Sequence, residues 1–224
     1  MKPALTLAAT AAAASLALVA APSEARAQLK WEASAGVGGA GRLTSGGSPT
    51  EIGPAAQLDA HVALIPLVRA GAYLAFDSAP EDGAATRRFY AGGLRAKIMS
   101  PFPRGDLQAW LFVGVGYAAI ARSEYAAVAP TTRAAGDAAV PGVVTVASAG
   151  GGLLEIPFGV GLAYKVAKPW KLQLELSGRP AAATYGSVYS DRAYTGPSGY
   201  RGTLPASGAD AFGIFALVGL GFEP

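Results

Sequence analysis

The chain has 224 residues, enough for one domain or two small ones. Only 15% of the residues are charged and 51% are hydrophobic, which indicates a membrane protein or an unusually apolar soluble one. The net charge of +3 is too small to predict nucleic-acid binding, and the lack of cysteine excludes disulfides, thiolate metal sites and a lipoprotein anchor.

The first segment is typical of an export signal. Lys2 supplies a positive charge, residues 4–20 are uncharged and rich in Ala and Leu, and Ala25 and Ala27 provide the small residues of a signal-peptidase site. We predict cleavage after Ala27, so that residues 1–27 are removed and residues 28–224 form the mature domain. An uncleaved N-terminal membrane anchor is the alternative.

Eight later segments alternate between apolar and polar or small residues, the pattern of strands with one apolar face. In chain order they cover residues 29–37, 57–64, 69–77, 90–98, 107–122, 154–165, 170–179 and 212–222. In the seventh, leucines at 172, 174 and 176 alternate with Lys171, Gln173 and Glu175. These segments have about the length that a tilted strand needs to cross a bilayer.

The connections between these segments also alternate. They are short around Pro66, at residues 101–105 and at Lys168-Pro169, and long at residues 41–55, 78–87, 123–150 and 180–209. Short turns at one end and long loops at the other are typical of outer-membrane barrels. We therefore predict an all-β fold: an eight-stranded antiparallel up-and-down transmembrane β-barrel with both termini on the periplasmic side.

The apolar face of this barrel is predicted to point outward. The opposite face mixes Gly and Ala with a few charges and amides, which suits the narrow interior of an eight-stranded barrel. Aromatic residues also gather near predicted strand ends, as interfacial belts do. They are Trp31, Trp170 and Phe222 at one end and Phe76, Tyr90, Tyr117 and Phe212 at the other. A soluble barrel of lipocalin type, with the apolar face inside, is the alternative.

Two stretches carry a resemblance to known proteins. Residues 156–165, the Pro-Trp turn and residues 172–176 are followed by a final strand, 213–222, rich in glycine and aromatics. Over residues 28–224 the chain resembles the small outer-membrane β-barrel families, of the OmpA-like transmembrane domain, OmpX and OmpW types. Such barrels usually end in an aromatic residue read by the insertion machinery, whereas here Glu223 and Pro224 follow Phe222.

Charged residues on the predicted inward face form the main candidate site. Unpaired charges inside a narrow barrel would each cost several kcal/mol, so we expect these side chains to pair across the lumen with Gln57, Gln108 and Gln173. The set is Glu32, Asp59, Arg95, Lys97, Glu155, Lys171 and Glu175. It is interpreted as a structural plug, and a gated narrow path for ions or solutes is the alternative.

The last long connection is a possible surface-recognition loop. Tyrosine and arginine are enriched at binding hot spots. The loop holds Tyr185, Tyr189, Arg192, Tyr194, Tyr200 and Arg201. The plainer interpretation is a Gly/Pro/Ser-rich loop that covers the mouth of the barrel.

No catalytic, metal or cofactor site is predicted. His61 is the only histidine, and the alternation turns it into the lumen. The expected function is a non-enzymatic structural or surface-interaction role in the cell envelope. A narrow channel or transporter for ions or small hydrophobic solutes is the alternative, and a lipid-modifying envelope enzyme is the weaker one. Expected partners are outer-membrane lipid, the export and barrel-insertion machinery and an extracellular ligand held by the loops. The protein is expected to be a monomer that binds no nucleic acid.

Overall fold

The computed structural model describes residues 30–44, 52–79, 87–101, 105–122, 125–129, 142–146, 149–186, 192–195, 201–204 and 210–224. The predicted signal peptide, residues 1–27, lies outside these ranges, so its cleavage stays a prediction. Within them, no helix combines the length and apolar content that a membrane crossing requires.

Most of the described residues lie in strands, and none of them lies in a helix. Nine strands make the main sheet, and two small hairpins lie apart from it. The main strands are β1 (Trp31–Thr44), β2 (Gly53–Ile65), β3 (Val68–Ala79), β4 (Arg87–Met99), β5 (Leu107–Arg122), β8 (Ala149–Glu155), β9 (Phe158–Ala167), β10 (Trp170–Gly186) and β13 (Asp210–Phe222). The hairpins are β6 (Tyr125–Ala129) with β7 (Gly142–Val146), and β11 (Arg192–Thr195) with β12 (Arg201–Leu204).

The main sheet closes on itself, because β13 pairs with both β1 and β10, and every pairing is antiparallel. Strands β8 and β9 share one position in the wall, since β5 and β10 each pair with both. Ile156 and Pro157 separate them, and the Pro157 carbonyl accepts a hydrogen bond from the Gly114 amide (2.7 Å). The ring therefore has eight wall positions, which confirms the predicted eight-stranded antiparallel up-and-down barrel.

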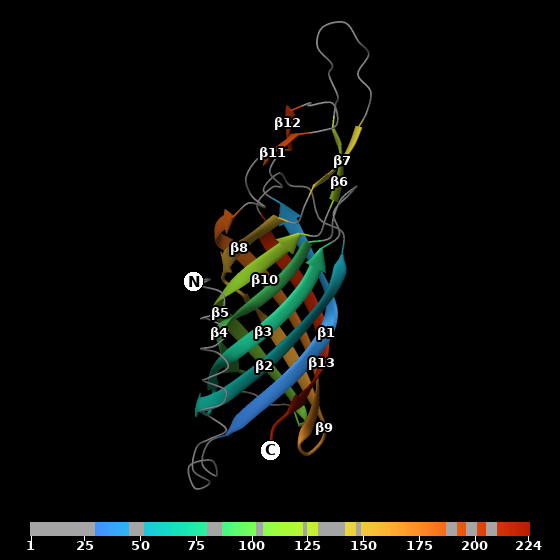
Figure 1. Ribbon diagram of the computed structural model, residues 1–224. Helices are drawn as coiled ribbons and strands as arrows, with labels where there is room; N and C mark the ends of the chain where they lie inside the picture. Colours follow the sequence, from blue (N-terminus) through green and yellow to red (C-terminus); the bar gives the residue numbers. More distant parts are fainter. Residues whose placement is uncertain are drawn as a thin grey trace, which may run out of the picture.

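The two ends of the barrel differ. The end with the tight β2–β3, β4–β5 and β9–β10 connections and with Glu223 is called the turn end here. The other end, which carries the two hairpins, is called the loop end; Figure 1 shows the hairpins at the top, away from the C-terminus. In the β4–β5 turn Gly105 has a φ of 63°, a left-handed conformation that glycine adopts without strain.

The predicted loop boundaries were too wide. The range 41–55 includes the end of β1 and the start of β2, and the range 180–209 includes seven residues of β10, Pro180–Gly186. As a result Arg42 and Arg87, which were assigned to loops, lie on strands with their side chains buried. The alternation of small residues there is too weakly amphipathic to mark the strand ends.

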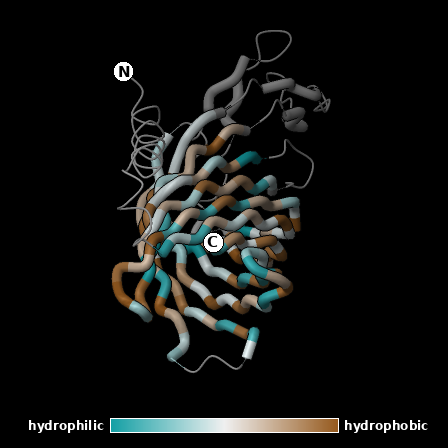
Figure 2. Tube along the Cα trace, turned by 90° about the horizontal axis from the view of Figure 1, so that it is seen from below, coloured by the Kyte–Doolittle hydropathy of each residue, from teal (hydrophilic) through white to brown (hydrophobic). Residues whose placement is uncertain are grey.

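The apolar face points outward. On β10, Leu176 is 50% exposed whereas the adjacent Glu175 is 7% exposed. Figure 2, seen from the turn end, shows hydrophobic and hydrophilic positions alternating along the strands. The soluble-barrel alternative requires the opposite arrangement, so it does not fit this wall.

Aromatic side chains pair near both ends of the wall. At the turn end, the Phe222 ring lies 5.6 Å from Trp31 and 5.2 Å from Trp170, centroid to centroid. Nearer the loop end, the rings pair as Phe76 with Tyr90 (5.4 Å), Tyr117 with Tyr185 (5.7 Å) and Phe158 with Phe212 (6.3 Å). The apolar wall lies between these two groups.

Glycines on the inward face make room for large side chains from neighbouring strands. A Cβ atom at Gly116 would overlap the Tyr73 hydroxyl, and one at Gly161 would overlap the Trp110 indole. Tyr73 and Trp110 are both buried. The lumen is thus filled by side chains whose shapes match glycines opposite them.

Candidate functional site in the lumen

The predicted charged set lies inside the barrel. Each of its members has 9% or less of its surface exposed. They come from five wall positions, β1, β2, β4, β8 and β10, and the period of two places them on one face of the sheet. Their hydrogen bonds and ion pairs fall into three levels along the barrel axis.

The central level is built around Arg95 on β4. Its guanidinium donates to both carboxylate oxygens of Glu175, at 3.0 and 2.6 Å, and its Nε lies 3.1 Å from Oδ1 of Asp59. The Gln57 amide nitrogen donates to Asp59 and to Glu175, each at 3.0 Å. The Arg95 guanidinium also lies 4.3 Å from the centroid of the Phe112 ring. This level joins β2, β4 and β10 across the lumen.

The turn-end level begins at Glu32 on β1. Lys97 Nζ donates to Oε1 of Glu32 at 3.0 Å, and Arg69 donates to Oε2 of the same carboxylate. Lys97 also lies 5.0 Å from the Trp110 ring centroid, so its charge is held by a carboxylate and an aromatic face.

Glu223 completes the turn-end level. Arg69 donates to its Oε1 at 2.9 Å, and Lys171 donates to its Oε2. Lys171 also donates to the Gln108 side-chain oxygen at 2.8 Å. The residue that follows the last strand therefore connects β3 and β10 across the turn-end mouth. Its backbone amide donates to the Pro169 carbonyl at 2.9 Å.

The loop-end level contains Arg179 on β10. Its guanidinium donates to Glu155 at 3.3 Å and to the Gln57 side-chain oxygen at 2.5 Å. The Tyr73 hydroxyl donates to the same Glu155 oxygen at 3.0 Å. The Arg179 guanidinium lies 3.9 Å from the Phe215 ring centroid. Gln57 thus links this level to the central one.

A second arginine lies further toward the loop end. Arg42 donates to both oxygens of Asp77, at 2.9 and 2.8 Å, and both side chains are buried. Its guanidinium lies 3.7 Å from the Phe89 ring centroid. This bidentate pair joins β1 and β3 near the loop-end mouth.

Several members of the network were missing from the predicted set. They are Arg42, Arg69, Asp77, Arg179 and Glu223. Arg69 and Asp77 are the ends of the third predicted strand and Arg179 ends the seventh, each at an inward position of the alternation, so parity alone was enough to add them. Arg42 has the parity of Glu32 and could have been found by extending that strand. Glu223 was treated as a tail beyond the last strand.

His61 lies within the network and is buried. Its Nε2 accepts from Arg95 Nε at 3.4 Å, and its Nδ1 is 3.8 Å from the Glu32 carboxylate. Ser34, on the adjacent strand, donates its hydroxyl to Asp59 at 3.4 Å. Within the described residues, His61 is therefore surrounded by charged side chains of the network. Among the same residues, no three His, Cys, Asp or Glu side chains gather as a metal site would require.

The predicted recognition loop is only partly described. Tyr185 lies on β10, half exposed, and stacks on Tyr117 over Gly152. Tyr189 and Tyr200 fall outside the described residues. Arg192 and Tyr194 lie on β11 and Arg201 on β12, where Tyr194 is paired with Gly202. The structure therefore assigns one of these tyrosines to the barrel wall and leaves the recognition role a prediction.

Comparison with known proteins shows similarity in fold. No protein-family model matches the sequence, and no curated protein matches it. Among solved structures, Neisserial surface protein A has a TM-score of 0.52 and 11% identity, over 88% of this chain and 97% of that one. A major outer membrane protein of Thermus thermophilus has a TM-score of 0.54 and 14% identity, over 88% of this chain and 100% of that one.

The fold is that of the small outer-membrane β-barrels. The resemblance inferred from residues 156–176 and 213–222 is thereby confirmed at the level of architecture. At such low identity the likeness extends to the fold alone, because one barrel architecture serves many functions.

Proposed function

We propose that this chain is a non-enzymatic outer-membrane protein with a closed lumen and a structural or surface-interaction role in the cell envelope. The observation that carries the proposal is the central level, in which Arg95 bonds to Glu175 and approaches Asp59 across the lumen. Side chains from opposite walls meet there with short distances and little exposed surface. Such an arrangement closes a narrow barrel and fixes the register of its strands.

The residues on the outside of the barrel wall support membrane insertion. Its outward leucines and valines lie between aromatic pairs near both ends, as in transmembrane barrels. A closed ring also pairs the backbone polar groups of every strand, which hydrocarbon requires. In this proposal the turn end faces the periplasm, the loop end faces outward, and the export and barrel-insertion machinery deliver a monomer.

The first experiment is the electrophoretic mobility of the protein from purified outer membranes, boiled against unboiled. A closed, detergent-resistant barrel is expected to migrate differently before and after boiling. Recovery in the soluble periplasmic fraction, with no mobility difference, would contradict the proposal.

A narrow channel is the second candidate. Charged side chains continue along the lumen from Glu223 at the turn end to Arg42 at the loop end. Some of their buried polar atoms, including Glu155 Oε2 and Arg179 Nε, have no hydrogen-bond partner among the described residues. In a channel, such atoms would contact water along the path.

Conductance in planar bilayers separates the two candidates. A closed structural barrel is expected to give no resolved current steps across the usual voltage range. Discrete steps from the purified protein, changed in conductance or ion selectivity by removal of a positive charge near the loop-end mouth, would favour the channel. The Arg42→Met variant and the matched outward change Leu74→Met serve as the test and its control.

A further inference from the structure

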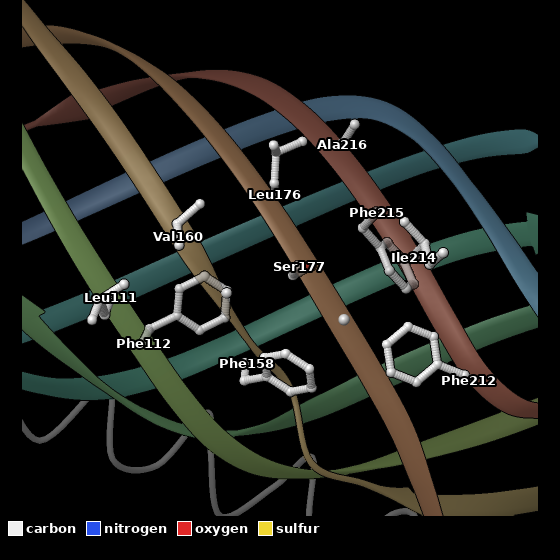
Figure 3. Close-up of a pocket in the computed structure, with 12 residues that line it drawn as sticks. Leu111, Phe112, Phe158, Val160, Leu176, Ser177, Phe212, Ile214, Phe215 and Ala216 are labelled. Carbon is white, nitrogen blue, oxygen red and sulfur yellow. The ribbon is translucent and has the colours of Figure 1, made fainter.

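A hollow lies in the outer wall of the barrel where β9, β10 and β13 run side by side. Its volume is about 650 Å³, and it opens toward the outside of the barrel. Figure 3 shows the Phe158 and Phe212 rings on opposite sides of β10, with Val160, Leu176 and Ile214 around them. Phe112 and Phe215, which contact Arg95 and Arg179 from the lumen side, lie between the hollow and the charged network.

The hollow arises from small residues at outward positions. Leucines occupy outward positions 172, 174 and 176 of β10, but the next outward residue is Gly178. Leu176 is paired with Ala216 on β13, and Gly178 is paired with Phe158 on β9 and Ile214 on β13. Gly178 on β10 and Ala216 on β13 are therefore diagonal neighbours without large side chains, and a depression remains between the larger residues around them.

The two phenyl rings form its wall toward the loop end. A Cβ atom at Gly178 would lie 2.7 Å from Cζ of Phe212 and 3.0 Å from Cζ of Phe158. Both ring edges thus lean over the glycine from either side. Behind the hollow, Phe112 and Phe215 fill the lumen, so its base is closed by aromatic rings.

The lining selects for hydrocarbon. Eleven of its twelve residues are apolar or glycine, and the remaining one, Ser177, is buried with no hydrogen-bond partner for its hydroxyl among the described residues. A charged or strongly polar ligand would be desolvated there without compensation. An acyl chain has no polar group to desolvate. In the proposed membrane setting, acyl chains are the groups that contact this face.

We propose that the hollow is a binding site for one acyl chain of a membrane lipid, with the lipid headgroup toward the loop end. The Phe158–Phe212 pair belongs to the aromatic group nearer that end, so the chain enters between that group and the middle of the bilayer. The site would hold this chain in one place, whereas the rest of the wall contacts exchanging lipid. The inference rests on the proposed insertion in a membrane.

The test is photolabelling in phosphatidylethanolamine–phosphatidylglycerol vesicles that contain a phospholipid with a diazirine in the middle of one acyl chain. Adducts mapped by peptide mass spectrometry are expected to concentrate on Val160, Leu176 and Ala216. The Ala216→Leu variant fills the hollow and is expected to lower the labelling of Val160 and Leu176 severalfold. The matched control is Ala60→Leu, which adds the same side chain at an exposed outward position of β2 and is expected to leave it unchanged.

The outcomes separate this inference from the proposed function. Adducts spread evenly around a heat-modifiable barrel would overturn the site and leave membrane insertion standing. Cross-links between two copies through these residues would also overturn it, because a second chain would then occupy the hollow. Failure of wild type to enter membranes would overturn both. If Ala216→Leu itself loses heat-modifiability, Val160→Phe fills the same space from β9 and is tested in its place.

Discussion

The central and turn-end levels of the lumen use the same kinds of charged groups in different surroundings. At the centre, the Arg95 and Glu175 side chains are 1% and 9% exposed and meet through two parallel hydrogen bonds. At the turn end, the Arg69 and Glu223 side chains are 12% and 21% exposed, and each also has another partner. Water can compensate a lost charge at Glu223, but not at Arg95 or Glu175. Ion pairs in one lumen should therefore differ widely in their effect on stability.

The largest effect is expected from Glu175→Gln. The change leaves Arg95 buried with fewer counter-charges, which costs about 3–5 kcal/mol where a buried pair is broken from one side. Guanidinium unfolding in micelles, followed by tryptophan fluorescence, measures it. Unchanged unfolding of Glu175→Gln would contradict a stabilising role for the central level.

A smaller effect is expected from Gly116→Ala, which tests shape at the centre without changing charge. The added Cβ overlaps the Tyr73 hydroxyl, and overpacking of this kind costs about 1–3 kcal/mol. The control is Gly150→Ala, whose Cβ would be 3.8 Å from the nearest atom, the Ile120 carbonyl oxygen. Equal stability losses for the two variants, measured by the same unfolding curves, would show that glycine flexibility rather than fit is responsible.

The smallest effect is expected from Glu223→Gln. This carboxylate is partly exposed, and exposed ion pairs contribute about 0–1 kcal/mol. The difference between wild type and variant should shrink further in high salt, because mobile ions screen accessible charges. Unfolding midpoints at low and high sodium chloride measure this. A loss as large as that of Glu175→Gln would mean that the two levels are not distinct.

Sequence periodicity predicted the parts of this barrel that depend on side-chain direction. Parity alone decides whether Leu176 or Glu175 faces the lumen, so the wall and the charged set could be derived from the pattern. The strand ends were missed where small residues weaken the alternation, as around Arg42. Trp110 and Phe112 were missed because apolar inward residues hide a period of two.

Partners within the lumen were less predictable. Whether Arg95 contacts Glu175 or Glu155 depends on strand register and on the tilt of the barrel, which single-strand patterns do not contain. The contact between Gly161 and Trp110 could not be predicted for the same reason, because it also depends on strand register. Predicting the hollow near Gly178 would require the register of β9, β10 and β13 relative to one another.

The pairing of inward glycines with large side chains has an evolutionary consequence. Gly116 and Tyr73, like Gly161 and Trp110, share one volume although they belong to different strands. In diverging descendants of this chain, a larger residue at 116 or 161 should arise together with a smaller one at 73 or 110. Such linked exchanges would conserve the filled volume of the lumen while the identities of the residues in it drift.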